Sequence, residues 1–221
     1  MAAVKKALLK IDFVSDVSCP WCVIGLKSLE KALTKLPEVK ADIHFQPFEI
    51  NPDMVKEGEE INEHLARKYG GSPAQFEGNR QRIRARGEEL GFNFAMGARS
   101  RIYNTFDAHR LIHWAGTKSA EAQHKLKLGL FTDYFTNGKD PSSETVLVEA
   151  ATSAGLDAQE ARTILSTDAF APEVKQAEAK WRSLNINGVP AVIINDKHLI
   201  SGGQPPEVFE QALRQIAQDD A

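Results

Sequence analysis

The hydrophobic pattern of the first fifty residues predicts a strand, a helix and a second strand. Residues 8–15 are apolar and β-branched enough for a buried strand that ends at polar residues. Apolar residues then recur at helical spacing from 24 to 36 and stop at Pro37, after which residues 43–48 alternate as in a strand. The short connection between the helix and the second strand suits a right-handed parallel crossover.

Helical periodicity then continues from about residue 59 to residue 167, where we find no convincing strand. The pattern predicts helices over 61–69, 73–90, 103–115, 120–135, 143–153 and 158–165. Glycines, which commonly end helices, stand at positions 70, 71, 91, 116, 138 and 155.

Mixed structure returns in the last quarter of the chain. We expect a helix over 171–184, strands over 191–195 and 198–201 joined by a turn at 195–197, and a helix over 206–218. Strands at both ends of the chain with helices between them imply an insertion. We therefore expect an α/β domain made of residues 1–58 and 171–221, and an inserted helical subdomain over 59–170.

Composition is that of a soluble globular chain: 42% of the 221 residues are hydrophobic and 26% are charged. The net charge of -3 gives no strong attraction for nucleic acid or an anionic membrane. The apolar runs, such as residues 189–194, are far shorter than the ~18 residues of a membrane span. Residues 1–10 lack the apolar stretch of a secretory signal, so we expect a cytoplasmic protein with neither nucleic acid nor membrane as its partner.

The two cysteines of the chain are three residues apart, in Cys19-Pro20-Trp21-Cys22. A cytosolic protein of this size seldom uses cysteines as a structural staple. Cys19 stands where the strand gives way to the helix, so free backbone N–H groups and the helix dipole favour its thiolate, and Pro20 suits the first helical turn. Cys22 is one turn further on and more sheltered, as suits a resolving thiol, and Trp21 between them is a candidate substrate contact.

A second motif, Gly188-Val189-Pro190, precedes the apolar strand of the last quarter. A proline there is expected at the first residue of the strand or in a cis peptide bond. The helix, strand, turn, strand and helix around it would complete the β-α-β unit of the N-terminus. The two halves together predict a thioredoxin fold interrupted by a large all-helical insertion.

These motifs resemble the DsbA-like thioredoxin-fold oxidoreductase family over essentially the whole chain. Three segments are similar to its FrnE-like branch, which is related to 2-hydroxychromene-2-carboxylate isomerases and kappa-class glutathione transferases: Phe13-Val-Ser-Asp-Val-Ser-Cys-Pro-Trp-Cys22, Asn104-Thr-Phe-Asp-Ala-His-Arg-Leu111 and Ile200-Ser-Gly-Gly-Gln-Pro205.

The resemblance implies a thiol-disulfide oxidoreductase, acting as a reductase or isomerase, with Cys19 as nucleophile and Cys22 as resolving thiol. It implies a cis Val189–Pro190 bond facing the sulfurs, and we expect Pro20, Trp21, Val189 and Pro190 to contact the substrate. No bound cofactor is implied; glutathione is a candidate redox partner beside protein or small-molecule thiols and disulfides. A buried acid often lies under the motif in such proteins, and Asp12 matches it if Ser18 is an extra residue, whereas otherwise Phe13 occupies that place.

Three alternatives stay open. A glutathione-dependent isomerase or transferase would need only Cys19, which relatives of that type commonly replace by serine, so the presence of Cys22 argues against it. A Cys2His2 zinc site could use His109 and His113, one turn apart, but their distance in sequence from the cysteines disfavours it and we predict no metal. In a non-catalytic helical binding module, the cysteines would be incidental.

The remaining candidates have structural interpretations as well. His109 and His113 are favoured as a polar helix face over an active-site role, and Asn104 and Arg110 either line the groove or form ordinary caps and salt bridges. Three aromatic residues of helix 120–135 are predicted in the core: Phe131, Tyr134 and Phe135. A basic stretch could attract acidic ligands but is more typical of a solvated helix face: Arg80, Arg82, Arg84, Arg86, Arg99 and Arg101.

Overall fold

A four-stranded mixed sheet forms the centre of the molecule in the computed structural model, which describes residues 6–219. The strands are β1 (Ala7–Ser15), β2 (Val39–Pro47), β5 (Ala191–Ile194) and β6 (His198–Ser201), in the order β2-β1-β5-β6. β1 runs parallel to β2 and antiparallel to β5, which in turn is antiparallel to β6. The predicted parallel crossover and C-terminal hairpin are thus confirmed.

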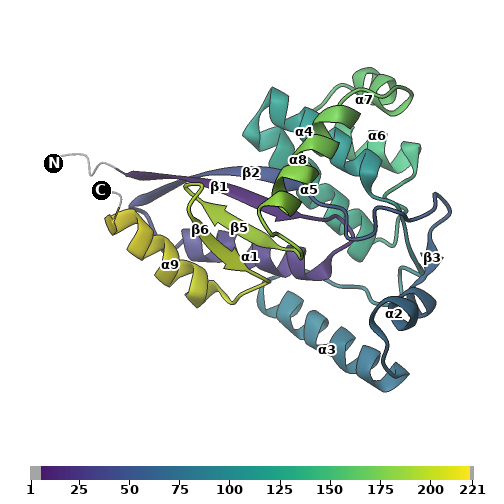
Figure 1. Cartoon of the computed structure of the whole chain (residues 1–221), viewed down its shortest axis with the longest axis horizontal. Helices are drawn as coiled ribbons and strands as arrows, with labels where there is room; N and C mark the ends of the chain where they lie inside the picture. The colour runs from purple at the N-terminus through teal and green to yellow at the C-terminus, as the bar shows by residue number, and fades with distance from the viewer. Residues whose placement is uncertain (1–5, 220–221) are drawn as a thin grey trace.

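Helices cover both faces of this sheet (Figure 1). Side chains alternate along β1, so Ile11 and Phe13 pack with α1 (Pro20–Leu33) and α9 (Pro206–Asp219). Val14 points the other way and packs with Trp181 of α8 (Ala171–Ser183). This arrangement of one sheet between α8 and the pair α1 and α9 confirms the predicted thioredoxin fold.

The large helical portion lies beyond one end of the sheet, whereas both chain termini lie toward the opposite end (Figure 1). Within residues 6–219 there are nine helices in all. Those of the helical portion are α2 (Ile61–Tyr69), α3 (Pro73–Glu89), α4 (Phe106–Lys118), α5 (Ala120–Phe135), α6 (Glu144–Ser153) and α7 (Ala158–Leu165). α4 to α7 gather on one side, and α2 and α3 form a separate pair below them in the view of Figure 1.

Two expectations for this helical portion were wrong. β3 (Glu59–Glu60) and β4 (Arg101–Ile102) form a small antiparallel ladder where we expected helices alone. Strands of two residues are too short to give a periodic pattern, and their partners are far apart in sequence. Gly116 does not end its helix, because α4 continues to Lys118; a Cβ at position 116 would lie 2.6 Å from the side-chain nitrogen of Gln123, so the glycine allows α5 to approach closely.

The helical portion is attached to the sheet at the outer edge of β2. There the side chain of Gln123 accepts a hydrogen bond from Phe45 N at 3.1 Å and donates to Phe45 O at 3.2 Å. One hydrophobic cluster is continuous from β1 and α1 into α4, α5, α6 and α7, and it includes the predicted core residues Phe131, Tyr134 and Phe135. The division into domains 1–58 with 171–221 and 59–170 stays a prediction.

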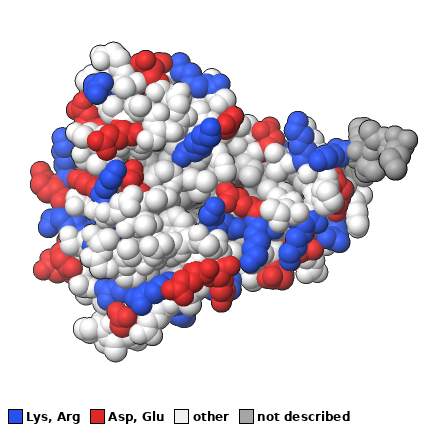
Figure 2. All heavy atoms as spheres, turned by 180° about the vertical axis from the view of Figure 1, so that it is seen from behind, with Lys and Arg blue, Asp and Glu red and all other residues white. Residues whose placement is uncertain are grey.

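Neither positive nor negative charge dominates the face seen in Figure 2. Basic and acidic side chains alternate there around an uncharged central area. No helix among residues 6–219 is long and apolar enough to cross a membrane. The first five residues of the segment that we interpreted as lacking a secretory signal lie outside the described part of the chain.

Gln123→Ala should lower the free energy of unfolding by about 1–3 kcal/mol, because it leaves the buried N–H and C=O of Phe45 without partners. Urea unfolding of the variant and the wild-type protein measures this difference. Gln81→Ala, on the exposed surface of α3, is the matched control and should change stability by less than about 0.5 kcal/mol. Equal effects of the two substitutions would contradict the role of Gln123 as the edge cap of β2.

Candidate active site

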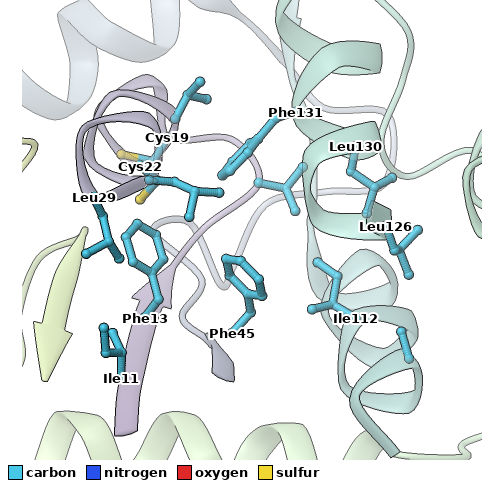
Figure 3. Close-up of a cluster of buried hydrophobic side chains, with 14 of the residues drawn as sticks. Ile11, Phe13, Cys19, Cys22, Leu29, Phe45, Ile112, Leu126, Leu130 and Phe131 are labelled. Carbon is cyan, nitrogen blue, oxygen red and sulfur yellow. The ribbon is translucent and has the colours of Figure 1, made fainter. Parts of the chain in front are cut away.

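The two cysteines lie together at the start of α1. Cys19 is the N-cap residue, Pro20 is in the first helical turn, and Cys22 N donates to Cys19 O at 3.1 Å. Both are free thiols, and the close-up in Figure 3 shows the two sulfurs above the ring of Phe13. Cys22 is fully buried and Cys19 is 5% exposed, so Cys22 is the more sheltered of the two, although the difference is small.

A loop explains why Cys19 is covered. The Val189–Pro190 peptide bond is cis, and the Cys19 thiol donates to Val189 O at 3.6 Å. Pro190 is itself buried against α1, where a Cβ at position 25 would lie 2.9 Å from its ring. Cys19 is nevertheless among the residues that line an open groove.

This groove, of about 740 Å³, collects the candidate substrate contacts. Pro20, Trp21 and Val189 are half-buried and line the groove beside Cys19. Pro190 is buried and is not among the described residues that line the groove. The opposite wall comes from α2 and α3 of the helical portion, through residues that include Leu65, Tyr69 and Phe76. The groove therefore lies between the thioredoxin part and the insertion.

Cys22 is held in its protonated form. Burial raises the pKa of the Cys22 thiol well above its usual range, and its hydrogen bond to Cys19 and the negative charge of the Cys19 thiolate raise it further. The ammonium group of Lys127 and the backbone N–H of Asp16 act in the opposite direction. Of these two groups, only Lys127 carries a full positive charge.

Lys127 comes from α5 of the helical portion and is 1% exposed. Its Nζ lies 4.9 Å from the centre of the Phe131 ring, and within residues 6–219 no carboxylate forms a salt bridge with it. Burial lowers the pKa of Lys127 to about 8, although the charges of Cys22, Asp16 and Cys19 favour its protonated form. We did not single out Lys127 from the sequence, although it lies on one helical stripe with Gln123, Leu130 and Tyr134.

Asp16 lies behind the cysteines and is fully buried. Its carboxylate accepts hydrogen bonds from Ser18 N at 3.1 Å and Ile50 N at 2.7 Å, and His109 Nε2 lies 3.5 Å away. Burial raises the pKa of Asp16, but His109 and the two backbone donors outweigh burial and bring it down to about 2. His109 is 1% exposed, so its interpretation as part of a polar helix face was wrong.

Asp12 is buried but does not lie under the cysteines. Its position on β1 is one residue from Phe13, so the two side chains point to opposite faces of the sheet, and Figure 3 shows Phe13 on the side of the sulfurs. The Asp12 carboxylate instead pairs with Lys10 Nζ at 3.1 Å and accepts from Gln46 Nε2 at 2.6 Å. Of the two alternatives, Phe13 therefore occupies the place beneath the motif.

Three other candidates from the sequence lie away from the groove. Asn104 Oδ1 accepts from Phe106 N at 2.9 Å, and Arg110 is buried against Asp107 and backbone carbonyls such as Ala169 O. These are the capping and salt-bridge roles that we considered. His113 packs against the ring of Phe170, and no three His, Cys, Asp or Glu side chains of the described residues form a group that could hold a metal.

Comparison with known proteins agrees with this geometry. Residues 10–214 match the model of the DSBA-like thioredoxin domain. The chain belongs to the DSBA-like thioredoxin family. The predicted family is thus confirmed, and the structural neighbours of this DSBA-like protein are consistent with the FrnE-like branch.

Relatives of this DSBA-like chain match it along almost its whole length. The crystal structure of a probable DsbA oxidoreductase from Streptomyces coelicolor has a TM-score of 0.89 and 31% identity, covering 96% of this chain and 91% of that one. The uncharacterized protein YwbO of Bacillus subtilis (strain 168) is 25% identical over 92% of this chain and 94% of its own.

More distant structures share the fold. The cytosolic disulfide reductase DsbM from Pseudomonas aeruginosa, solved with GSH, has a TM-score of 0.64 at 14% identity, covering 95% of this chain and 99% of that one. A 2-hydroxychromene-2-carboxylate isomerase has a TM-score of 0.69 at 13% identity, covering 96% and 97% of the two chains.

Lys127→Met should raise the pKa of Cys22, because it removes the one ammonium group that favours the thiolate while keeping a side chain of similar volume. The thiolate absorbance of Cys22 can be titrated against pH in a Cys19→Ser background, with and without the substitution. Lys125→Met is the matched control, since Lys125 is exposed on the same helix and pairs with Glu121 at 2.6 Å. A lower pKa in Lys127→Met would refute the electrostatic role.

Glu49 next to the groove gives a pH-dependent prediction. It is 5% exposed, and burial together with the Glu178 carboxylate raises its pKa from 4.5 to about 8. The folded protein therefore binds this proton more tightly than the unfolded chain, so stability is full below the unfolded pKa and falls as pH rises toward 8.

Glu49→Gln, which mimics the protonated carboxyl, should remove roughly 3 kcal/mol of the loss of stability between about pH 5 and pH 9. Denaturant unfolding at several pH values measures the slope for both proteins. Glu207→Gln on the exposed surface of α9 should leave the slope unchanged. Parallel slopes of wild type and Glu49→Gln would show that Glu49 does not titrate in this range.

Proposed function

We propose that this protein is a thiol-disulfide oxidoreductase that reduces or isomerises disulfides through Cys19 and Cys22. The observation that carries the proposal is the pair of free thiols at the start of α1, of which Cys19, but not Cys22, is among the described residues that line the groove. Membership of the DSBA-like family supports it.

In the first step, the Cys19 thiolate attacks one sulfur of a substrate disulfide. A bond forms between Cys19 and that sulfur, and the other substrate sulfur leaves as a thiolate and takes up a proton. Pro20, Trp21 and Val189 would contact the substrate, and the backbone of Val189, next to the cis Pro190, would pair with an extended peptide.

In the second step, Cys22 attacks the sulfur of Cys19 and releases the remaining substrate thiolate. Once Cys19 is in a mixed disulfide, it no longer carries the charge that raises the pKa of Cys22, whereas Lys127 still lowers it. The resolving thiol thus ionises more easily after the first step than before. The protein has then lost two electrons, the substrate has gained them, and Cys19 and Cys22 form a disulfide.

Regeneration of the dithiol requires a reductant, and we propose a thiol such as glutathione, two molecules of which would give glutathione disulfide. The DsbM structure solved with GSH supports a partner of this kind. Glutathione would act as a redox partner and not as a bound cofactor. In a reducing cytoplasm, which we propose as the compartment, the resting state would be the dithiol and reduction or isomerisation would be favoured.

Cys22→Ser should trap the product, because no neighbouring thiol remains to release the substrate from Cys19. Turnover in a glutathione-coupled disulfide reduction assay should fall by at least about a hundredfold, and mass spectrometry should detect a mixed disulfide on Cys19. Cys19→Ser should abolish exchange without forming an adduct.

The same variants separate this function from a glutathione-dependent isomerase or transferase, whose chemistry needs one thiol at most. In that alternative, Cys22→Ser would be nearly silent and Cys19→Ser could retain activity, since a hydroxyl can hydrogen-bond a glutathione thiolate. Full turnover of Cys22→Ser with no adduct on Cys19 would favour that class.

A further inference from the structure

The groove beside Cys19 is basic in a protein of net negative charge. Four Lys and Arg side chains are among the described residues that line it: Lys68, Arg80, Arg99 and Arg182. Asp and Glu are absent from the same set of described lining residues. The charge that a substrate meets at the thiol is therefore opposite to the net charge of -3.

Neutral groups hold two of these cations in place at the mouth of the groove. Lys68 Nζ donates to Ile50 O at 2.7 Å and to Asn51 Oδ1 at 2.6 Å. Arg182 donates to Glu49 O at 3.0 Å, and its guanidinium lies 4.3 Å from the centre of the Phe48 ring. Within residues 6–219 neither forms a salt bridge, so their positive charge is positioned but not neutralised.

The other two cations differ from each other. Arg99 donates to the hydroxyl of Tyr134 at 3.0 Å and likewise has no carboxylate partner among the described residues. Arg80 pairs with Glu77 on the exposed surface of α3 at 3.4 Å, which screens part of its charge. His64 also lines the groove, but its ring is paired with Glu59 at 2.7 Å.

Nearby acids do not compensate this charge. Asp16 is fully buried and engaged by His109 and two backbone N–H groups. The raised pKa of Glu49 keeps its carboxyl mostly protonated near neutral pH. The neighbouring Glu178 accepts a hydrogen bond from Glu49 N at 2.6 Å and, among the described residues, forms no salt bridge with Arg182. Uncompensated cations in a recess with apolar walls concentrate the positive potential there.

We propose that this groove selects peptide disulfides that carry carboxylates next to the cysteine. Lys68 and Arg182 would each exchange a neutral acceptor for a carboxylate, while Trp21, Phe48 and Tyr69 would contact the apolar parts of the peptide. The inference rests on the proposed exchange reaction and adds the chemical class of its substrate.

The test follows single turnover of the protein reduced beforehand, so that its two thiols supply both electrons. The probes are peptide disulfides of one length whose cysteine is flanked by Glu, Gln or Lys. We expect the Glu peptide to react about tenfold faster than the Gln peptide at low salt, and the Lys peptide to react more slowly than both. The difference should shrink as ionic strength rises from about 0.01 M to about 1 M.

Substitutions locate the origin of this preference. The double variant Lys68→Gln with Arg182→Gln should lose most of the preference, and the charge-conserving pair Lys68→Arg with Arg182→Lys should keep most of it. Arg84→Gln is the matched control, because Arg84 is exposed on α3 and is not among the residues that line the groove. A preference that survives the double Gln variant would overturn the assignment.

Two further arms complete the design. Glutathione disulfide and its tetraethyl ester compare a small anionic substrate with the same substrate after its carboxylates are removed and its amino groups are kept. A faster reaction of the acid than of the ester, or of the Glu peptide than of the Gln peptide, supports the proposal. Hydroxyethyl disulfide is uncharged and reports exchange alone. Reaction with it but without charge preference overturns the substrate class, whereas failure to react with any disulfide overturns the proposed function itself.

Discussion

Asp16 joins three parts of the chain at one buried carboxylate. It follows the last residue of β1, its oxygens accept from the N–H of Ser18 just before the cysteines and of Ile50 after β2, and His109 of α4 faces it from the helical portion. A fully buried carboxylate is costly unless such partners surround it. Three features therefore depend on one another: the position of Cys19 at the helix start, the loop that carries Phe48 to Ile50, and the attachment of α4.

The same constraint explains how a helical insertion becomes part of the active site. Gln123 and Lys127 lie on one stripe of α5, the first bound to the edge of β2 and the second directed toward the thiols. An ammonium group inside a core destabilises the fold unless a negative charge can form nearby. The charges of Cys22 and Asp16 favour the protonated form of Lys127. Lys127 is therefore better suited to the proposed exchange reaction than to stability.

Local signals in the sequence were enough to predict the sheet, most helices and the place of the Cys19 to Cys22 motif at a helix start. Strand alternation, helix periodicity and proline positions all depend on residues that are close in sequence. We named His109 from these signals but favoured a polar helix face for it, because its buried partner Asp16 lies far away in the sequence. β3 and β4 were missed because two residues give no period. Lys127 could have been found, since it falls on the apolar stripe of α5 that contains Leu130 and Phe131.

Net charge was the least informative property, because it averages over groups whose charges the structure separates or suppresses. Glu49 and Asp16 count equally in the sum, yet burial leaves Glu49 mostly protonated near neutral pH and hydrogen bonds keep Asp16 ionised. Lys68 and Arg182 also count as one charge each, but both are exposed beside Cys19 and, among the described residues, neither pairs with a carboxylate. The field at the thiol thus follows from which charges are buried and paired, and it can be positive in a chain whose total is negative.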